Sequence, residues 1–231
     1  MAVAFDVFTA FTAGTGSLGG THTPVGTPKG VLVHVLCDAG SDQVTTVTYG
    51  GVNVPEAAGS PNVLSGGEGG SVYTYFLGSG IPTGAQTVSV SVSGAANKQA
   101  VCFTYTADTD TEIVDIDATI NSTSLANPSV TLSLASRTSA CSLVFFSGQN
   151  DIFSVTQLSG WTNRLEVDVG TESAGVYSYD TVGTADVTAG WTQTAEDAAM
   201  IALAVSEVAA ATAIFTKNQI ARQAVKRASV Y

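Results

Sequence analysis

Few side chains in this sequence could carry out chemistry. The 231 residues include two histidines, three cysteines and 19 acidic residues. His34 lies in the apolar run VLVHVLC, on the same strand face as Leu32 and Leu36, and is predicted to be packed. His22 lies in the turn-rich segment GGTHTPVGTPKG and is predicted to be solvated. Neither has a cysteine at zinc-ligand spacing, and on a strand Cys37 would point to the face opposite His34.

The densest acidic cluster is DTDTEIVDID, residues 108–117. Asp108, Asp110 and Glu112 resemble the start of a calcium loop. The loop pattern also requires a glycine at the sixth place and an acid at the twelfth, which are Ile113 and Thr119 here. We therefore interpret the cluster as a solvated strand face or loop, with calcium binding as the alternative.

Catalytic signatures for nucleophilic, phosphate-binding or dinucleotide-binding sites do not occur in the sequence. The chain is accordingly predicted not to be an enzyme and to use no cofactor. Four aromatic residues, Tyr73, Tyr75, Trp161 and Trp191, are candidates for stacking on sugars. Aromatic pairs also stabilise sheets directly, so core or sheet packing is the preferred interpretation of these rings.

The elements that must position these side chains are predicted to be strands. Short β-like runs recur every 8–15 residues between Gly, Pro, Asn and Asp, and TVSVSVS (87–93) alternates with a period of two. The run MIALAVSEV (200–208) is predicted to be the closing central strand. We expect an all-β fold, an antiparallel, jelly-roll-like β-sandwich, as one domain over residues 1–208. The similar segments SGWTN (159–163) and AGWTQ (189–193) are interpreted as two strand starts and not as a duplication.

Charge is scarce and unevenly distributed. Only 12% of residues are charged, against roughly 25% in an ordinary soluble domain. Residues 1–216 hold four basic and 19 acidic residues, a net charge of −15, which repels nucleic acid and anionic membranes. Cys37, Cys102 and Cys141 lie in apolar runs and are predicted to be buried free thiols, which fits synthesis in a reducing cytoplasm. A Cys37–Cys102 or Cys102–Cys141 bridge is the alternative.

The C-terminal segment differs from the body. Residues 209–231 are predicted to be a linker and a basic docking tail, with four of the eight basic residues in the last fifteen positions. Apolar and basic side chains share this tail, which is the composition of a docking segment. The predicted docking residues are Phe215, Lys217, Ile220, Arg222, Val225, Lys226, Arg227 and Tyr231. The alternative is a frayed end without a function.

Three longer segments carry a resemblance: VTTVTYGGVNV (44–54), VYTYFLGSGIPTGAQTVSVSVSG (72–94) and GVYSYDTVGTADVTAGWTQT (175–194). Together they resemble β-sandwich proteins of tailed bacteriophages over roughly residues 30–206. The shared motifs are turns and core positions. The resemblance therefore implies a β-sandwich fold and a protein that is located on the virion surface or associated with the tail. It implies no catalytic residues.

The function expected from these features is that of a phage virion structural protein, located on the capsid as a decoration (cement) protein or on the tail or fibre exterior. Its expected partners are other virion proteins and further copies of itself as a homo-oligomer, with no nucleic acid and no membrane. The expected location is the virion after synthesis in the host cytoplasm. The alternative is a carbohydrate-binding β-sandwich module for host or surface attachment.

Overall fold

The structure is a computed structural model that describes residues 3–64, 70–94, 96–125, 127–134, 137–148, 156–157, 159–170, 172–183, 185–192 and 196–208. Within these residues every regular element is a β-strand and no helix occurs. All the strand pairs formed by these residues are antiparallel. The prediction of an all-β antiparallel fold is therefore confirmed.

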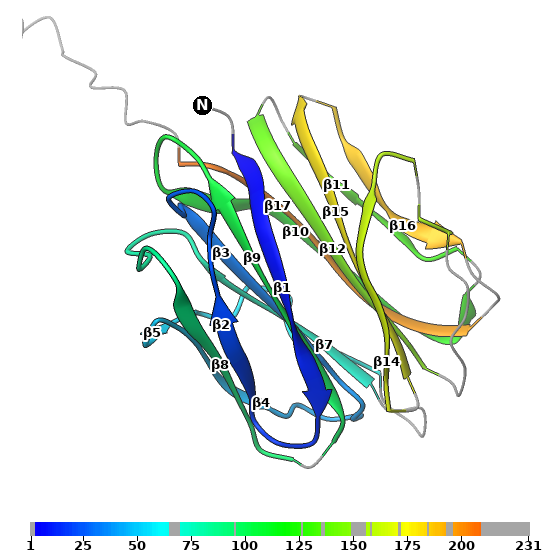
Figure 1. Cartoon of the computed structure of the whole chain (residues 1–231). Helices are drawn as coiled ribbons and strands as arrows, with labels where there is room; N and C mark the ends of the chain where they lie inside the picture. The colour runs from blue at the N-terminus through cyan, green and yellow to red at the C-terminus, as the bar shows by residue number, and fades with distance from the viewer. Residues whose placement is uncertain are drawn as a thin grey trace, which may run out of the picture.

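Residues 3–106 form a sandwich of two sheets, which we call unit 1 (Figure 1). Its strands are β1 Ala4–Gly14, β2 Leu18–His22, β3 Gly30–Cys37, β4 Val44–Tyr49, β5 Val52–Asn53, β6 Asn62–Leu64, β7 Gly70–Leu77, β8 Gln86–Val92 and β9 Lys98–Thr106. The inner sheet of unit 1 has the order β1-β9-β3-β7-β6, and the outer sheet has the order β2-β8-β4-β5.

Residues 111–207 form a second sandwich, which we call unit 2. Its strands are β10 Thr111–Leu125, β11 Ser129–Leu132, β12 Arg137–Gly148, β13 Thr156–Gln157, β14 Thr162–Val169, β15 Glu172–Gly183, β16 Val187–Thr192 and β17 Glu196–Glu207. The inner sheet of unit 2 has the order β10-β17-β12-β15-β14, and the outer sheet has the order β11-β16-β13. Strand β17 lies between β10 and β12, as the sequence predicted for the closing strand.

The two units have the same topology. Strands β1–β4 correspond to β10–β13, and β6–β9 correspond to β14–β17, in identical positions in the two pairs of sheets. Within unit 1 the two sheets combine in the strand order of a jelly roll, with β6 added at one edge. The expected single sandwich over residues 1–208 is thus corrected to two jelly rolls in tandem, joined by the short linker 107–110.

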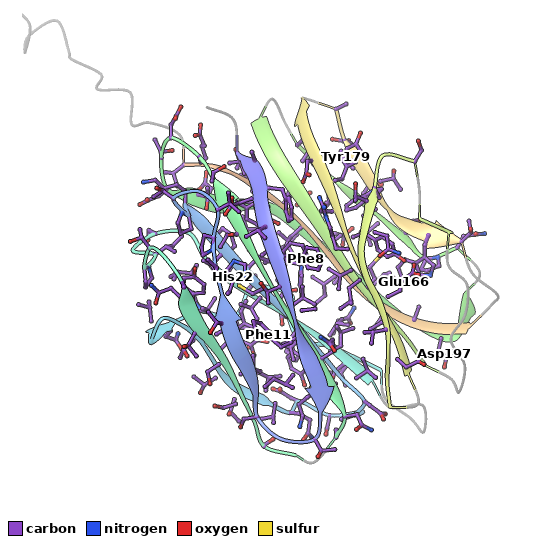
Figure 2. The ribbon with its side chains drawn as sticks, viewed as in Figure 1. Phe8, Phe11, His22, Glu166, Tyr179 and Asp197 are labelled. Atoms are coloured by element: carbon purple, nitrogen blue, oxygen red, sulfur yellow. The ribbon has the colours of Figure 1, made fainter. Side chains whose placement is uncertain are left out.

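The two jelly rolls stack through their inner sheets, giving four layers of strands with three apolar layers between them. The central apolar layer joins Leu32, Phe76 and Phe103 of unit 1 to Val176 and Ile201 of unit 2. A second layer fills unit 1 and a third fills unit 2. In Figure 2, Phe8 on β1 marks the central layer and Phe11 marks the layer inside unit 1.

This layering explains why the inner strands are apolar throughout. Every residue of β3, GVLVHVLC, is buried, because one face packs inside unit 1 and the other against unit 2. Strands of the outer sheets alternate instead. In β8, Val88 and Val90 are buried while Ser89 and Ser91 are partly exposed, because only one face of the outer sheet is covered.

The two units contact each other reciprocally. Edge strand β1 of unit 1 contacts edge strand β14 of unit 2, and edge strand β10 of unit 2 contacts edge strand β6 of unit 1. Because β1 corresponds to β10 and β6 to β14, each unit presents the same face to the other. This reciprocity is the geometry of an isologous dimer interface, here within one chain.

A short repeated sequence accompanies the repeated topology. VYTY (72–75) lies in β7 and VYSY (176–179) lies in the corresponding strand β15. Val72 and Val176 both face the central layer, while Tyr73 and Tyr177 are buried inside their own units. The segments SGWTN and AGWTQ, by contrast, belong to non-corresponding positions near β14 and in β16, so they are not the mark of this duplication.

Candidate functional site

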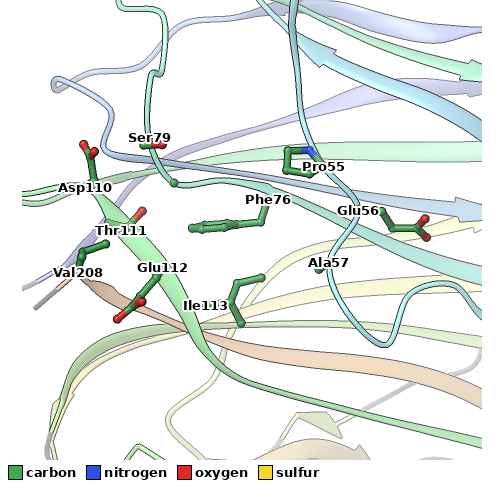
Figure 3. A pocket seen from close by; sticks show the side chains of 11 residues that line it. Pro55, Glu56, Ala57, Phe76, Ser79, Asp110, Thr111, Glu112, Ile113 and Val208 are labelled. Carbon is green, nitrogen blue, oxygen red and sulfur yellow. The ribbon is translucent and has the colours of Figure 1, made fainter.

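A hollow lies where the two units join, and we call it the junction groove. It has a volume of about 520 Å³ and is lined by residues of both units. Pro55, Glu56 and Phe76 come from unit 1, and Glu112 and Ile113 come from β10 of unit 2. Figure 3 shows Phe76 and Ile113 in the middle of the hollow, with Glu56 toward one end and Asp110 and Val208 toward the other.

Two hydrogen bonds between the units, and a third between the linker and the end of β17, hold the walls of this groove. The N–H of Thr111 donates to the carbonyl of Gly78 at 2.9 Å, and the Thr111 hydroxyl donates to the carbonyl of Lys29 at 2.6 Å. A Cβ on Gly78 would lie 1.9 Å from the Thr111 oxygen, so only glycine permits this approach. The N–H of Val208 donates to the carbonyl of Asp110 at 2.8 Å, which brings the end of β17 to the groove.

The groove combines an apolar floor with acidic groups at its rim. Phe76 and Ile113 supply the apolar surface, and Glu56, Asp110 and Glu112 supply carboxylates. Lys29 lies on the other side of Asp110, in an adjoining hollow of about 230 Å³. A ligand that suits this surface carries apolar side chains together with positive charges.

The acidic cluster proposed as a calcium alternative forms the linker between the units and the start of β10. The N–H of Asp108 donates to Oε1 of Glu207 at 2.6 Å, so part of the cluster joins the linker to the end of β17. Within the described part of the chain, no three His, Cys, Asp or Glu side chains gather in a way that could hold a metal ion. Calcium binding by Asp108, Asp110 and Glu112 stays the alternative prediction, and the hydrogen bond of Asp108 to Glu207 places this residue in a linker that is tied to β17.

The four aromatic residues considered for sugar stacking are all buried. Their exposed fractions are 0% for Tyr73, 5% for Tyr75, 6% for Trp161 and 1% for Trp191. The Tyr73 hydroxyl accepts a hydrogen bond from the N–H of Gln43 at 2.7 Å, and Nε1 of Trp161 donates to the carbonyl of Thr188 at 3.0 Å. Stacking on a sugar requires an exposed ring face, which none of these four rings offers in this arrangement.

No family model, no curated protein and no solved structure matches this chain. The described residues also include no helix that is long and apolar enough to cross a membrane. The resemblance to phage β-sandwich proteins therefore stays a prediction from the quoted motifs.

His34 is packed in the central layer, as predicted. It is fully buried, its Nδ1 lies 3.0 Å from the Thr74 hydroxyl, and its ring meets Phe103 edge-on. No described residue forms a hydrogen bond with its Nε2. Burial lowers the pKa of His34 to about 3, so the imidazole is neutral in the folded protein.

The prediction of a solvated His22 is wrong, because the structure buries this side chain at the end of β2. Its Nδ1 lies 2.9 Å from the Thr9 hydroxyl and its Nε2 lies 3.2 Å from the Thr104 hydroxyl. Thr104 donates in turn to Asp6 at 3.0 Å, and Asp6 also accepts from the N–H groups of two residues in the loop after β2.

This chain of polar groups holds β1, β2 and β9 together. Burial lowers the pKa of His22, and the nearby Asp6 carboxylate opposes that shift. Both His22 and Thr104 have no exposed surface, so no substrate could reach them in this conformation. The sequence offered no signal for this network, because His22 and Thr104 are 82 positions apart.

Cys37 and Cys102 are buried free thiols, as predicted. Burial raises the pKa of Cys37 to about 12 and that of Cys102 still further, which suppresses the reactive thiolate. The two side chains face the core of unit 1 from neighbouring strands, and Cys37 lies opposite Lys98 while Cys102 lies opposite Val33. The side chain of Cys141 lies outside the described part of the structure.

The predicted docking tail also lies outside the described residues, which end at Val208. This applies to all of the predicted docking residues: Phe215, Lys217, Ile220, Arg222, Val225, Lys226, Arg227 and Tyr231. Docking through these residues therefore stays a prediction. The described structure adds only the position from which the segment leaves, which is the rim of the junction groove.

Proposed function

We propose that this protein is a structural component of a bacteriophage virion exterior, either a capsid decoration protein or a part of the tail or fibre surface. The observation that carries the proposal is the stacking of two jelly rolls through inner sheets that are buried on both faces. Jelly rolls recur in viral capsid proteins and in lectins, so the fold alone leaves both classes open.

The packing of the central layer favours a mechanical role. Its core residues from both units are almost completely buried, and the Phe5 and Phe8 rings of β1 both pack on Phe103 of β9. A close-packed interior resists compression, so this layer would keep the two units in one fixed relation. A rigid block of this kind is suited to reinforcing or extending a particle surface.

The outer faces of the molecule support the same proposal. Thr45, Thr46, Ser129 and Thr131 stand on the exposed side of outer strands, so these sheets present hydroxyl groups in place of charges. The buried thiols of Cys37 and Cys102 are compatible with synthesis in the host cytoplasm before assembly. The carbohydrate-binding alternative has no such support, since the rings on which it depends are packed in the core.

The test is the protein content of purified particles. Virions from a lysate of cells that express this chain are separated on a density gradient, and the copy number of the chain per major capsid protein is measured by quantitative mass spectrometry. The proposal expects tens to hundreds of copies for a decoration protein, or a few copies for a tail component. Absence of the chain from intact particles would overturn it.

A glycan array provides the complementary measurement. The intact protein is applied beside the Tyr179→Leu variant, which changes a ring that is only partly buried and packs on Trp161. No glycan binding is expected from either protein. Specific binding by the intact protein that the variant loses would instead support the carbohydrate-binding class.

A further inference from the structure

We propose that the junction groove binds the C-terminal segment, residues 214–231, of a second copy of this chain, so that two copies exchange these segments. The inference goes beyond the virion role and does not depend on it. Particle composition tests the virion role, whereas the oligomeric state of the purified protein tests the exchange, so either can fail alone.

Charge complementarity is the first argument. The groove carries Glu56, Asp110 and Glu112, and the neighbouring Asp108 and Glu207 extend the acidic region along the linker and the end of β17. The segment 209–231 carries four basic residues and no acidic residue. A positively charged segment is therefore attracted to this end of a body whose net charge is −15.

Apolar complementarity is the second argument. The middle of the groove is formed by the Phe76 ring, which keeps 9% of its surface exposed, and by the partly buried Ile113 side chain. The segment offers Phe215, Ile220 and Val225 between its basic residues. Burying one or two of these side chains on Phe76 and Ile113 would add hydrophobic stabilisation to the electrostatic attraction.

The position at which the described chain ends favours binding of the segment to the groove of a second copy over binding to the groove of its own molecule. Val208 lines the groove and is held there by its hydrogen bond to Asp110, so the segment starts at the groove. Because β17 runs antiparallel to β10, the described chain heads away from Ile113 where it ends at Val208, so a return into the same groove requires a reversal of direction. Residues 209–217, AAATAIFTK, contain no Gly, Pro, Asn or Asp, which are the residues that favour tight turns.

Reciprocal exchange gives a closed two-fold dimer. Each copy donates one segment and receives one, so both grooves are filled and no donor segment is left to extend the assembly. The attraction is between charged groups near the surface, so raised salt should weaken the dimer.

The experiment compares four proteins by size-exclusion chromatography with light scattering at low and high salt. They are the intact chain, residues 1–208, the groove variant Glu56→Lys/Asp110→Lys, and the control Asp117→Lys/Asp186→Lys. The control makes the same change in net charge at exposed acidic residues outside the groove. Circular dichroism and thermal melting of each protein check that the two jelly rolls remain folded.

The proposal expects a dimer for the intact chain and for the control, and a monomer for residues 1–208 and for the groove variant. A further variant reverses the charge of the segment by Lys217→Glu/Arg222→Glu/Lys226→Glu/Arg227→Glu. Mixing this variant with the groove variant should restore dimers in which the basic groove of one chain holds the acidic segment of the other. A synthetic peptide of residues 214–231 should bind residues 1–208 at least tenfold more tightly than it binds the groove variant truncated at 208.

Three outcomes would overturn the proposal. A monomeric intact chain would exclude exchange, and a folded groove variant that remains a dimer would exclude the groove. Residues 1–208 forming the same dimer as the intact chain would show that the C-terminal segment does not make the interface.

Discussion

The guanidinium carbon of Arg164 in unit 2 lies 4.0 Å from the centroid of the Phe5 ring in unit 1. The same guanidinium forms an ion pair with Asp180 at 3.2 Å, and its Nε donates to the Ser178 hydroxyl at 2.8 Å. Burial raises the pKa of Asp180, and Arg164 opposes the shift. Arg164 thus connects the edge strands β14 and β1, and its position over an aromatic ring is a geometry that lysine does not reproduce.

The contact between Arg164 and Phe5 can be measured by a double-mutant cycle with Arg164→Met and Phe5→Leu. We expect a coupling energy of about 1 kcal/mol, because the cation lies over a ring that is partly removed from water. The cycle is measured by urea denaturation in an Asp180→Asn background, so that the ion pair does not contribute. Additive single-variant effects would show that the two side chains do not interact.

Acid should destabilise the protein partly through His34. The folded state keeps His34 neutral down to a pKa of about 3, whereas the unfolded chain takes up the proton below its ordinary pKa of 6.5. The stabilising contribution is therefore complete above pH 6.5 and is lost as the pH falls from 6.5 toward 3. Between pH 7 and pH 4 we expect protonation of His34 in the unfolded chain to lower the free energy of unfolding by about 3 kcal/mol.

The His34→Leu variant isolates this effect, because it keeps an apolar side chain between Leu32 and Leu36 and cannot titrate. Its unfolding free energy should fall by about 3 kcal/mol less than that of the intact protein over the same pH range. Urea denaturation at several pH values makes the comparison. His22→Gln should show a smaller difference, since Asp6 opposes the lowering of the His22 pKa. Parallel pH profiles for His34→Leu and the intact protein would contradict the assignment.

The thiols of Cys37 and Cys102 should be inert in the folded protein. With its pKa raised to about 12, the thiolate fraction of Cys37 at pH 8 is on the order of 10³ lower than that of an exposed cysteine. A Cys141→Ser variant should therefore react with a thiol reagent only after denaturant is added. Rapid reaction of one thiol in the native protein would show that unit 1 opens readily.

Unit 1 alone should not remain a stable monomer. A chain of residues 1–108 would expose the face of its inner sheet that bears Leu32, Leu36, Val72, Phe76 and Phe103. An apolar patch larger than a few hundred Å² on a soluble domain leads to association. Because this face is part of a reciprocal contact, we expect dimers or larger aggregates by light scattering. Residues 1–208, which keep both units, serve as the monomeric control, and a monomeric, cooperatively melting 1–108 would contradict the prediction.

Several local features followed directly from the sequence. The alternation in TVSVSVS identified β8 and its buried valines, because a strand with one covered face needs a period of two. MIALAVSEV identified the central strand β17, since a strand buried on both faces needs a continuous apolar run. Strand β1 was not predicted, because a register shift between Phe5 and Val7 interrupts its alternation.

The sequence also held a weak signal of duplication that could have been used. VYTY (72–75) and VYSY (176–179) occupy corresponding strands, and in both the first tyrosine is buried in its own unit. Four residues are too few to establish a repeat, because alternating valine and tyrosine suits many strands. The correspondence became clear only from the identical strand orders of the two units.

By itself, then, the sequence determined the secondary structure class, the inward and outward faces of many strands, and the burial of Cys37, Cys102 and His34. These properties depend on neighbouring residues, whose spacing along a strand decides which side they face. Tertiary structure alone decided that there are two jelly rolls, that His22 is buried beside Thr104, and that Phe76, Asp110 and Val208 meet in one groove. Each of these depends on which distant strands pair and which faces stack. An apolar run has the same pattern whether its second face meets another sheet of its own unit or a sheet of the next unit.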